Sequence, residues 1–267
     1  MNSNRQCCPP NHFPAGTLTC YAPVMSEVSR LARPDGLRLA CRHHPGAGPT
    51  IVFLPGYMSD MEGSKAVALH DWAAREGRSF LRLDYSGCGA SEGRFEDGTL
   101  DRWRDDVLLL IDRLTEGPVV LVGSSMGGWL MLLVALAIPD RIVGLVGIAA
   151  APDFTEWGFT DADKAILRTE GRIAEPSAYS DDPYVTTLGF WESGQANRLL
   201  DGAIPLDCAV RLLHGMADPD VPWRISARLA DALSANDVRV LLIKDGDHRL
   251  SRDADIGLLV AQVAEIA

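Results

Sequence analysis

A short glycine–serine turn in the middle of the chain constrains its fold more than any other feature. Residues 123–127 read Gly-Ser-Ser-Met-Gly, the pattern G-x-S-x-G. The β-branched run 119–122 before it is typical of a buried strand, and apolar residues recur at helical spacing over 129–137. A strand that turns directly into a helix holds the serine in strained geometry above the sheet edge. The pattern therefore predicts Ser125 as a nucleophile rather than as part of an ordinary loop.

Two backbone N–H groups near this turn are candidates for binding a developing oxyanion. The apolar strand expected at 50–54 ends at Pro55-Gly56, before a flexible polar loop. A strand that stops there exposes the N–H of Tyr57 toward the neighbouring nucleophile. The helix that follows the serine offers the N–H of Met126 and the positive end of its dipole. We therefore expect Tyr57 and Met126 to form an oxyanion hole.

Length and charge limit the possible functions. The chain has 267 residues, 47% hydrophobic and 23% charged, which suits one α/β domain with a modest insertion. Its formal net charge of −11 disfavours nucleic acid and anionic membranes as partners. The longest apolar run, 129–138, is too short to span a bilayer, so we expect no stable membrane insertion. The oligomeric state is left open.

The first 26 residues are expected to be a disordered leader before a folded domain at 27–267. They are rich in Pro, Asn and Cys and lack apolar periodicity and a signal-peptide core. The six cysteines show no metal-ligand spacing, which favours free thiols and a reducing compartment, without a metal. We expect the cytoplasm, with the mitochondrion as the alternative if the leader is an unrecognised transit peptide.

Strands and helices alternate along most of the chain, which predicts a mostly parallel sheet with helices on both faces. Pro34-Asp35-Gly36 predicts a hairpin over 30–41. The alternation stops at about 152–205, after the sixth expected strand, where a small helical lid is expected. Its aromatic residues mostly serve to pack the lid onto the domain. The candidates for contacting an acyl chain are Trp157, Phe190 and Trp191.

A base and an acid follow at the ends of later strands. Asp218 comes after the strand expected at 208–215, and His248 after that at 238–243, so both should lie with Ser125 at the carboxyl edge of the sheet. His248 would activate Ser125 as general base, and Asp218 would orient His248. Asp220 suits a helix-capping role, and His214 a structural role at its strand end. Chemistry of this kind needs no cofactor.

The chain order Ser…Asp…His resembles that of the α/β-hydrolases. From about Arg38 to the C-terminus, the motifs more narrowly resemble the mitochondrial palmitoyl-protein thioesterase family, also described as acyl-glucuronide esterases, with a weaker match in the lid. The resemblance implies an α/β-hydrolase domain, a triad of Ser125, Asp218 and His248, and an ester, a thioester or an acylated protein as substrate. It is carried by the segments 53–57, 83–87, 121–132, 211–216, 221–223 and 247–249.

Other functions occur on the same fold. A C–C bond hydrolase or a cofactor-free peroxidase would use the same serine, whereas dehalogenases and epoxide hydrolases need an aspartate at position 125. A non-catalytic binding module is the third alternative, and the complete triad disfavours it. We therefore expect a serine esterase or thioesterase that acts through an acyl-enzyme.

Overall fold

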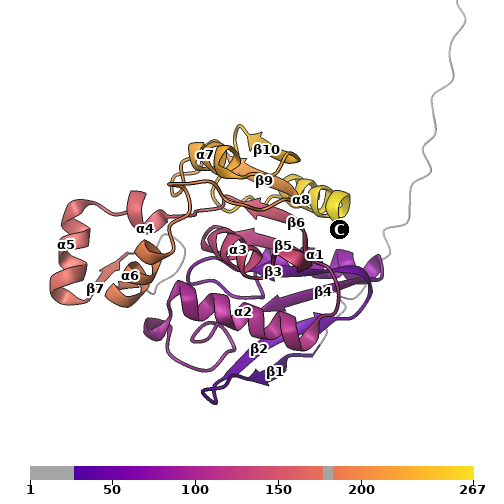
Figure 1. Ribbon diagram of the computed structural model, residues 1–267, viewed down its shortest axis with the longest axis horizontal. Helices are drawn as coiled ribbons and strands as arrows, with labels where there is room; N and C mark the ends of the chain where they lie inside the picture. The colour runs from indigo at the N-terminus through magenta and orange to yellow at the C-terminus, as the bar shows by residue number, and fades with distance from the viewer. Residues whose placement is uncertain (1–26, 177–182) are drawn as a thin grey trace, which may run out of the picture.

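An eight-stranded sheet lies at the centre of the computed structural model, which describes residues 27–176 and 183–267 (Figure 1). The strand order is β1-β2-β4-β3-β5-β6-β9-β10. Antiparallel pairing is confined to β1–β2 and β2–β4, and the remaining neighbours are parallel. The predicted mostly parallel sheet and the N-terminal hairpin are confirmed. The strands are β1 (Ser29–Ala32), β2 (Arg38–His44), β3 (Ala47–Leu54), β4 (Arg78–Leu83), β5 (Val119–Ser124), β6 (Ile142–Ile148), β9 (Ala209–Gly215) and β10 (Val238–Ile243).

Helices cover both faces of the sheet because side chains along a strand point alternately to opposite faces. In β3, Val52 and Leu54 belong to the core beneath α2, α3 and α7, whereas Ile51 and Phe53 belong to the core beneath α1 and α8. The central strands β5 and β6 therefore read as nearly continuous apolar runs. The helices are α1 (Ser64–Arg75), α2 (Leu100–Leu114), α3 (Met126–Ala137), α7 (Arg224–Ala232) and α8 (Asp253–Ile266), with short 3₁₀ turns at Phe95–Asp97 and Pro139–Arg141.

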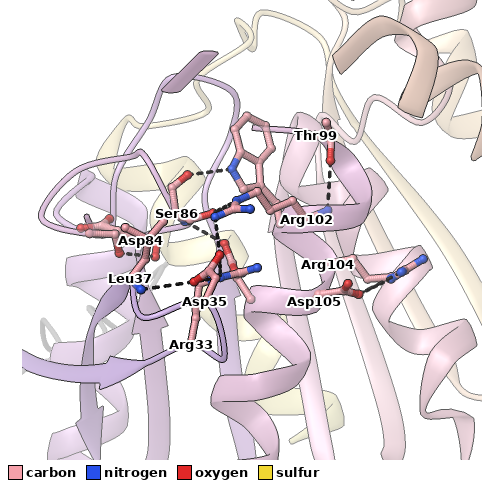
Figure 2. A network of polar contacts seen from close by, with 12 residues as sticks. Arg33, Asp35, Leu37, Asp84, Ser86, Thr99, Arg102, Arg104 and Asp105 are labelled. Carbon is pink, nitrogen blue, oxygen red and sulfur yellow. Dashed lines mark hydrogen bonds and ion pairs between the residues drawn. The ribbon is translucent and has the colours of Figure 1, made fainter. Parts of the chain in front are cut away.

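A polar network joins the N-terminal hairpin to α2 and to the loop after β4 (Figure 2). The guanidinium of Arg102 donates to Asp35 at 2.8 Å and to the hydroxyl of Ser86 at 3.0 Å. The neighbouring Tyr85 donates its phenol hydrogen bond to the carbonyl of Pro55 at 2.9 Å. Tyr85 therefore joins the loop after β4 to the segment that leads into the candidate oxyanion loop.

The lid lies between β6 and β9 and extends to one side of the sheet (Figure 1). It was expected to be helical, but β7 and β8 also form a two-stranded antiparallel sheet within it. Each of these strands has only four residues, too few for a recognisable alternation. The buried carboxylate of Asp153 accepts hydrogen bonds from the N–H groups of Leu199 and Leu200, at 2.8 and 2.7 Å, and so joins the two ends of the insertion. The lid elements are α4 (Phe154–Trp157), α5 (Asp161–Glu170), β7 (Arg172–Glu175), β8 (Tyr184–Thr187) and α6 (Leu188–Ala196).

The predicted leader, residues 1–26, lies outside the described residues. Within the described part of the chain, no helix combines the length and apolar character needed to cross a bilayer. The cysteines at 41, 88 and 208 are free thiols.

Candidate active site

Ser125 occupies the strained turn between β5 and α3. Its backbone angles are φ 54° and ψ −119°, a region that residues other than glycine rarely adopt. The surrounding backbone holds this conformation through three hydrogen bonds: Ser125 N–H donates to Ile148 at 2.9 Å, and its carbonyl accepts from Gly128 and Ala151 at 2.9 and 3.0 Å. The turn therefore lifts the Ser125 side chain out of the sheet at its carboxyl edge.

The glycines of the motif are required by close backbone contacts. A Cβ atom on Gly127 would lie 2.2 Å from the carbonyl oxygen of Leu54 in β3. A Cβ atom on Gly123 would lie 2.3 Å from the carbonyl oxygen of Gly127 itself. The G-x-S-x-G pattern thus allows α3 to start directly against two parallel strands.

The structure brings Ser125, His248 and Asp218 together in a hydrogen-bonded chain. Nε2 of His248 lies 3.1 Å from Oγ of Ser125, and Nδ1 lies 2.8 Å from Oδ2 of Asp218. The three residues follow β5, β10 and β9, so the carboxyl ends of three parallel strands supply them. When Nδ1 donates to the carboxylate, Nε2 of the neutral ring is the acceptor that faces the serine hydroxyl. This geometry can deprotonate Ser125.

Asp218 is held as a buried carboxylate. Its side chain is 0% exposed, and Oδ1 accepts the N–H groups of Asp220 and Val221 at 2.8 and 2.9 Å. Burial by itself raises the pKa of Asp218, but hydrogen bonds from His214, His248 and Val221 outweigh it and hold that pKa well below its usual value. Asp220 does not cap α7 as expected, because the helix begins at Arg224 with Trp223 at its N-cap.

The candidate oxyanion donors lie beside the nucleophile. A Cβ atom on Gly56 would lie 3.5 Å from Cβ of Ser125. The loop after β3 therefore passes close to the serine. The N–H of Met61 donates to buried Asp84 at 2.7 Å and fixes the far end of this loop. Met126 opens α3, where the first N–H groups have no intrahelical acceptor. Tyr57, Ser125 and Met126 line the same lobe of the cleft, so both residues remain candidate donors.

The cleft over Ser125 has two lobes, which share Tyr57, Ser125, Tyr184 and His248. The polar lobe, of about 470 Å³, is lined by side chains such as Ser59, Lys65 and Arg249. The apolar lobe, of about 460 Å³, is lined mainly by side chains such as Phe154, Trp157, Phe159 and Val221, with Glu175 and Asp220 also among its lining residues. The site thus offers two chemically different directions from the nucleophile.

Lys65 is a lining residue that the sequence did not reveal. It is the second residue of α1, and its amine donates to the carbonyl of Arg249 at 2.5 Å, next to His248. Burial and then the positive charge of Arg249 lower the pKa of Lys65 to about 8. The signal available was its place at the start of the helix after β3, since that end of α1 faces the carboxyl edge of the sheet.

Of the three lid residues expected to contact substrate, only Trp157 lines the cleft. Phe190 is 1% exposed and packs on Tyr57 and Trp103. Trp191 is 7% exposed, and its indole donates to the carbonyl of Thr155 at 3.0 Å. The expectation for Phe190 and Trp191 is therefore corrected, because neither lines either lobe. Phe190 packs the lid onto the main domain, and Trp191 joins α6 to α4. Tyr184, which lines both lobes, was missed.

One set of side chains could also be considered for a metal. Asp218, Asp220 and His248 each offer a ligand atom, all within 4.8 Å of one another. Oδ2 of Asp218 and Nδ1 of His248 are already joined by a hydrogen bond. A cation at this place would therefore compete with the triad.

The doubly covered parallel sheet, the strained serine and the Ser-His-Asp chain together define an α/β-hydrolase. The sequence profile described as the Alpha/beta hydrolase family matches residues 51–262, and the chain belongs to this family. It is therefore a hydrolase, and the motif resemblance drawn from the sequence is confirmed.

Two kinds of relative show the same family relationship. Palmitoyl-protein thioesterase ABHD10, mitochondrial, from Homo sapiens is 42% identical over 245 residues, covering 90% of this chain and 80% of that protein. Among solved structures, alpha/beta hydrolase domain-containing protein 10 from mouse matches with a TM-score of 0.84 and 39% identity, covering 90% of this chain and 98% of that one. A putative hydrolase from Agrobacterium vitis S4 matches with a TM-score of 0.85 and 39% identity, over 92% and 99%.

Proposed function

We propose that this protein is a serine hydrolase that cleaves carboxylic esters or thioesters through an acyl-enzyme, with acylated proteins of the palmitoyl type as its main substrate class. The observation that carries the proposal is the 3.1 Å contact between Nε2 of His248 and Oγ of Ser125, with Asp218 behind the imidazole. The relatives named as palmitoyl-protein thioesterases support the thioester. The motif resemblance extends the class to acyl glucuronides.

The reaction uses groups that the chain itself supplies. Ser125 Oγ attacks the acyl carbonyl while His248 Nε2 takes its proton, and the carbonyl oxygen becomes negative between the N–H groups of Tyr57 and Met126. His248 then gives the proton to the departing thiolate or alkoxide, which leaves an ester on Ser125. Water attacks this ester by the same route, so the carboxylic acid is released and Ser125 regains its proton.

The two lobes of the cleft suggest how substrate lies. The apolar lobe, with Phe154, Trp157 and Phe159, suits an acyl chain because it shields apolar surface from water. The polar lobe, which His248 and Lys65 line, suits the departing cysteine-containing peptide or sugar. His248 lines both lobes, so it can reach the leaving-group atom from its place between them.

Replacement of the nucleophile tests the proposal. Ser125→Ala should lower kcat on p-nitrophenyl esters and acyl-cysteine thioesters by on the order of a million-fold. Ser234→Ala, an exposed serine that lines neither lobe, should stay within about threefold and serves as the matched control. Unchanged hydrolysis by Ser125→Ala refutes the proposal. A β-diketone in the same panel detects a C–C bond hydrolase, and a Ser125 that no fluorophosphonate labels favours a binding module.

The compartment is a separate part of the proposal. The mammalian relatives carry the word mitochondrial in their names, which supports the mitochondrial alternative, whereas the Agrobacterium structure of similar identity comes from a bacterium. Incubation of the full chain and of residues 27–267 with isolated mitochondria distinguishes a mitochondrial from a cytoplasmic location. Protease protection of the full chain alone supports a mitochondrial leader, and protection of neither supports the cytoplasm.

A further inference from the structure

The side chain of His214 lies directly behind the carboxylate of Asp218. His214 is the penultimate residue of β9 and is 0% exposed. Its Nε2 lies 3.0 Å from the carbonyl oxygen of Val221 and 3.3 Å from Oδ2 of Asp218. The same Oδ2 accepts the hydrogen bond from Nδ1 of His248 at 2.8 Å. Two imidazole rings therefore meet at one oxygen atom of the triad acid.

The other side of the ring determines which nitrogen carries the proton. Nδ1 of His214 lies 2.7 Å from the hydroxyl of Ser226, a buried residue of α7. Nε2 faces a carbonyl and a carboxylate, which are both acceptors, so this nitrogen bears a hydrogen. The hydroxyl of Ser226 then donates to Nδ1 of the neutral ring. Ser226 thus maintains the tautomer in which His214 donates toward Asp218.

A histidine that only filled the end of β9 would be satisfied by Ser226 and Val221 and would need no contact with Asp218. We propose that His214 is a positioning residue for the triad: it fixes the Asp218 carboxylate against His248 and shares its Oδ2 charge between two donors. This inference rests on the proposed function. Without His214, Oδ1 of Asp218 keeps its two backbone hydrogen bonds, but Oδ2 is held by His248 alone. Oδ2 is then fixed less firmly, and its charge acts on the imidazolium of His248 alone.

Two measurable effects follow from this arrangement. A less firmly held Oδ2 orients His248 less well, so kcat falls while KM changes little. A more strongly stabilised imidazolium moves the acid limb of the kcat/KM profile to higher pH. Among the described residues, the other charged or titratable groups near Asp218 and His248 are Asp220 before α7, Tyr184 of β8, Glu175 of β7, Lys65 of α1, and Asp247 and Arg249 beside His248. They are the same in all His214 variants, so a shift of the limb reports His214.

The experiment compares His214→Gln, His214→Leu and Ser226→Ala. Sites are counted by fluorophosphonate titration, and p-nitrophenyl ester hydrolysis is followed from pH 5 to 9. Glutamine keeps an N–H donor near the place of Nε2, so kcat per titrated site should stay within about threefold of wild type. Leucine removes the donor, so kcat should fall roughly 10- to 100-fold with KM nearly unchanged and the acid limb raised. Ser226→Ala should lower kcat and raise the acid limb as His214→Leu does, but by smaller amounts.

Packing alone predicts a different outcome. Equal losses in His214→Gln and His214→Leu with an unmoved acid limb, or a full kcat per site in His214→Leu, would overturn the proposal. If His214→Leu does not fold, the downfield ¹H NMR resonance of the His248 Nδ1 proton decides. It should move in Ser226→Ala, and an unmoved resonance overturns the proposal. Failure of the proposed function is seen separately, because wild type and Ser125→Ala would then hydrolyse equally.

Discussion

The phenol of Tyr57 donates a hydrogen bond to the main-chain carbonyl of Val185 in the lid, at 2.6 Å. In return, the hydroxyl of Tyr184 lies 3.4 Å from the carbonyl oxygen of Tyr57. Burial raises the pKa of Tyr57 well above its usual value, so the phenol stays protonated and keeps its role as donor. The loop that carries a candidate oxyanion donor is therefore attached to β8, which links the lid to the candidate oxyanion hole.

Removal of the Tyr57 hydroxyl should weaken this link. Tyr57→Phe keeps the ring among its aromatic neighbours but loses a hydrogen bond, which contributes about 1 kcal/mol. We expect kcat on a short ester to fall roughly five- to tenfold. Tyr184→Phe, which loses a longer contact, is the matched control and should have a smaller effect. Wild-type kcat in Tyr57→Phe would show that the lid contact does not position the oxyanion hole.

Asp218→Asn should give a folded protein with very low activity. The amide cannot stabilise the imidazolium and favours the wrong tautomer of His248, so kcat should fall about ten-thousand-fold. Steady-state kinetics with p-nitrophenyl acetate measure the loss, and circular dichroism checks the fold. Asp231→Asn, an exposed residue of α7 that lines neither lobe, should retain kcat within about threefold. Equal losses in both variants would remove Asp218 from its proposed role.

The backbone strain at Ser125 should be measurable as a difference in stability between two variants of this residue. Glycine adopts φ 54° and ψ −119° without steric conflict, whereas alanine keeps the Cβ of serine. Relief of about 1–3 kcal/mol of strain, less the greater flexibility of glycine in the unfolded chain, leaves Ser125→Gly about 1 kcal/mol more stable than Ser125→Ala. Urea unfolding of the two inactive variants measures the difference. Equal midpoints would show that the turn stores no strain.

The stabilisation contributed by Asp218 should disappear in acid. Its pKa is lower in the folded than in the unfolded protein, so the unfolded chain binds more protons between the two values and stability rises with pH there. The contribution is complete above the unfolded pKa, about 4, and is lost as pH falls through the folded value. The difference in urea midpoint between wild type and Asp218→Asn should therefore shrink from pH 7 to pH 3. A constant difference would contradict the hydrogen-bond assignment.

The two lid tryptophans should separate substrate binding from packing. Trp157 lines the apolar lobe, so Trp157→Ala should lower kcat/KM for long-chain esters more than for acetate, by about tenfold. Trp191 is buried, and the guanidinium carbon of Arg168 lies 4.8 Å from the centroid of its ring. Trp191→Ala should therefore lower the free energy of unfolding by about 3–5 kcal/mol. Its activity loss should be equal for both esters. A preferential long-chain loss in Trp191→Ala would return this residue to the substrate site.

Much of the site could be predicted because strand ends in a parallel sheet converge on one edge. Ser125, Asp218 and His248 each follow a recognisable apolar strand, so chain order and strand polarity were enough to expect them together. The donor side of His214 could not be predicted, since sequence shows a strand-end histidine but not the rotation that directs Nε2 at Asp218. Phe190 and Trp191 were misplaced for a similar reason: aromatic composition predicts burial, but not which partner buries the ring.

The hydrogen bonds of Asp153 to the end of the lid bear on how this family could diversify. The Asp153 carboxylate ties the start of the insertion to Leu199 and Leu200 near its end, so the two ends of the lid are held side by side before the chain continues to β9. Most of the lid between Asp153 and Leu199 could be exchanged as one unit without moving a strand that carries Ser125, Asp218 or His248. Preference for one acyl chain over another can therefore diverge in lineages that inherit the same reaction unchanged.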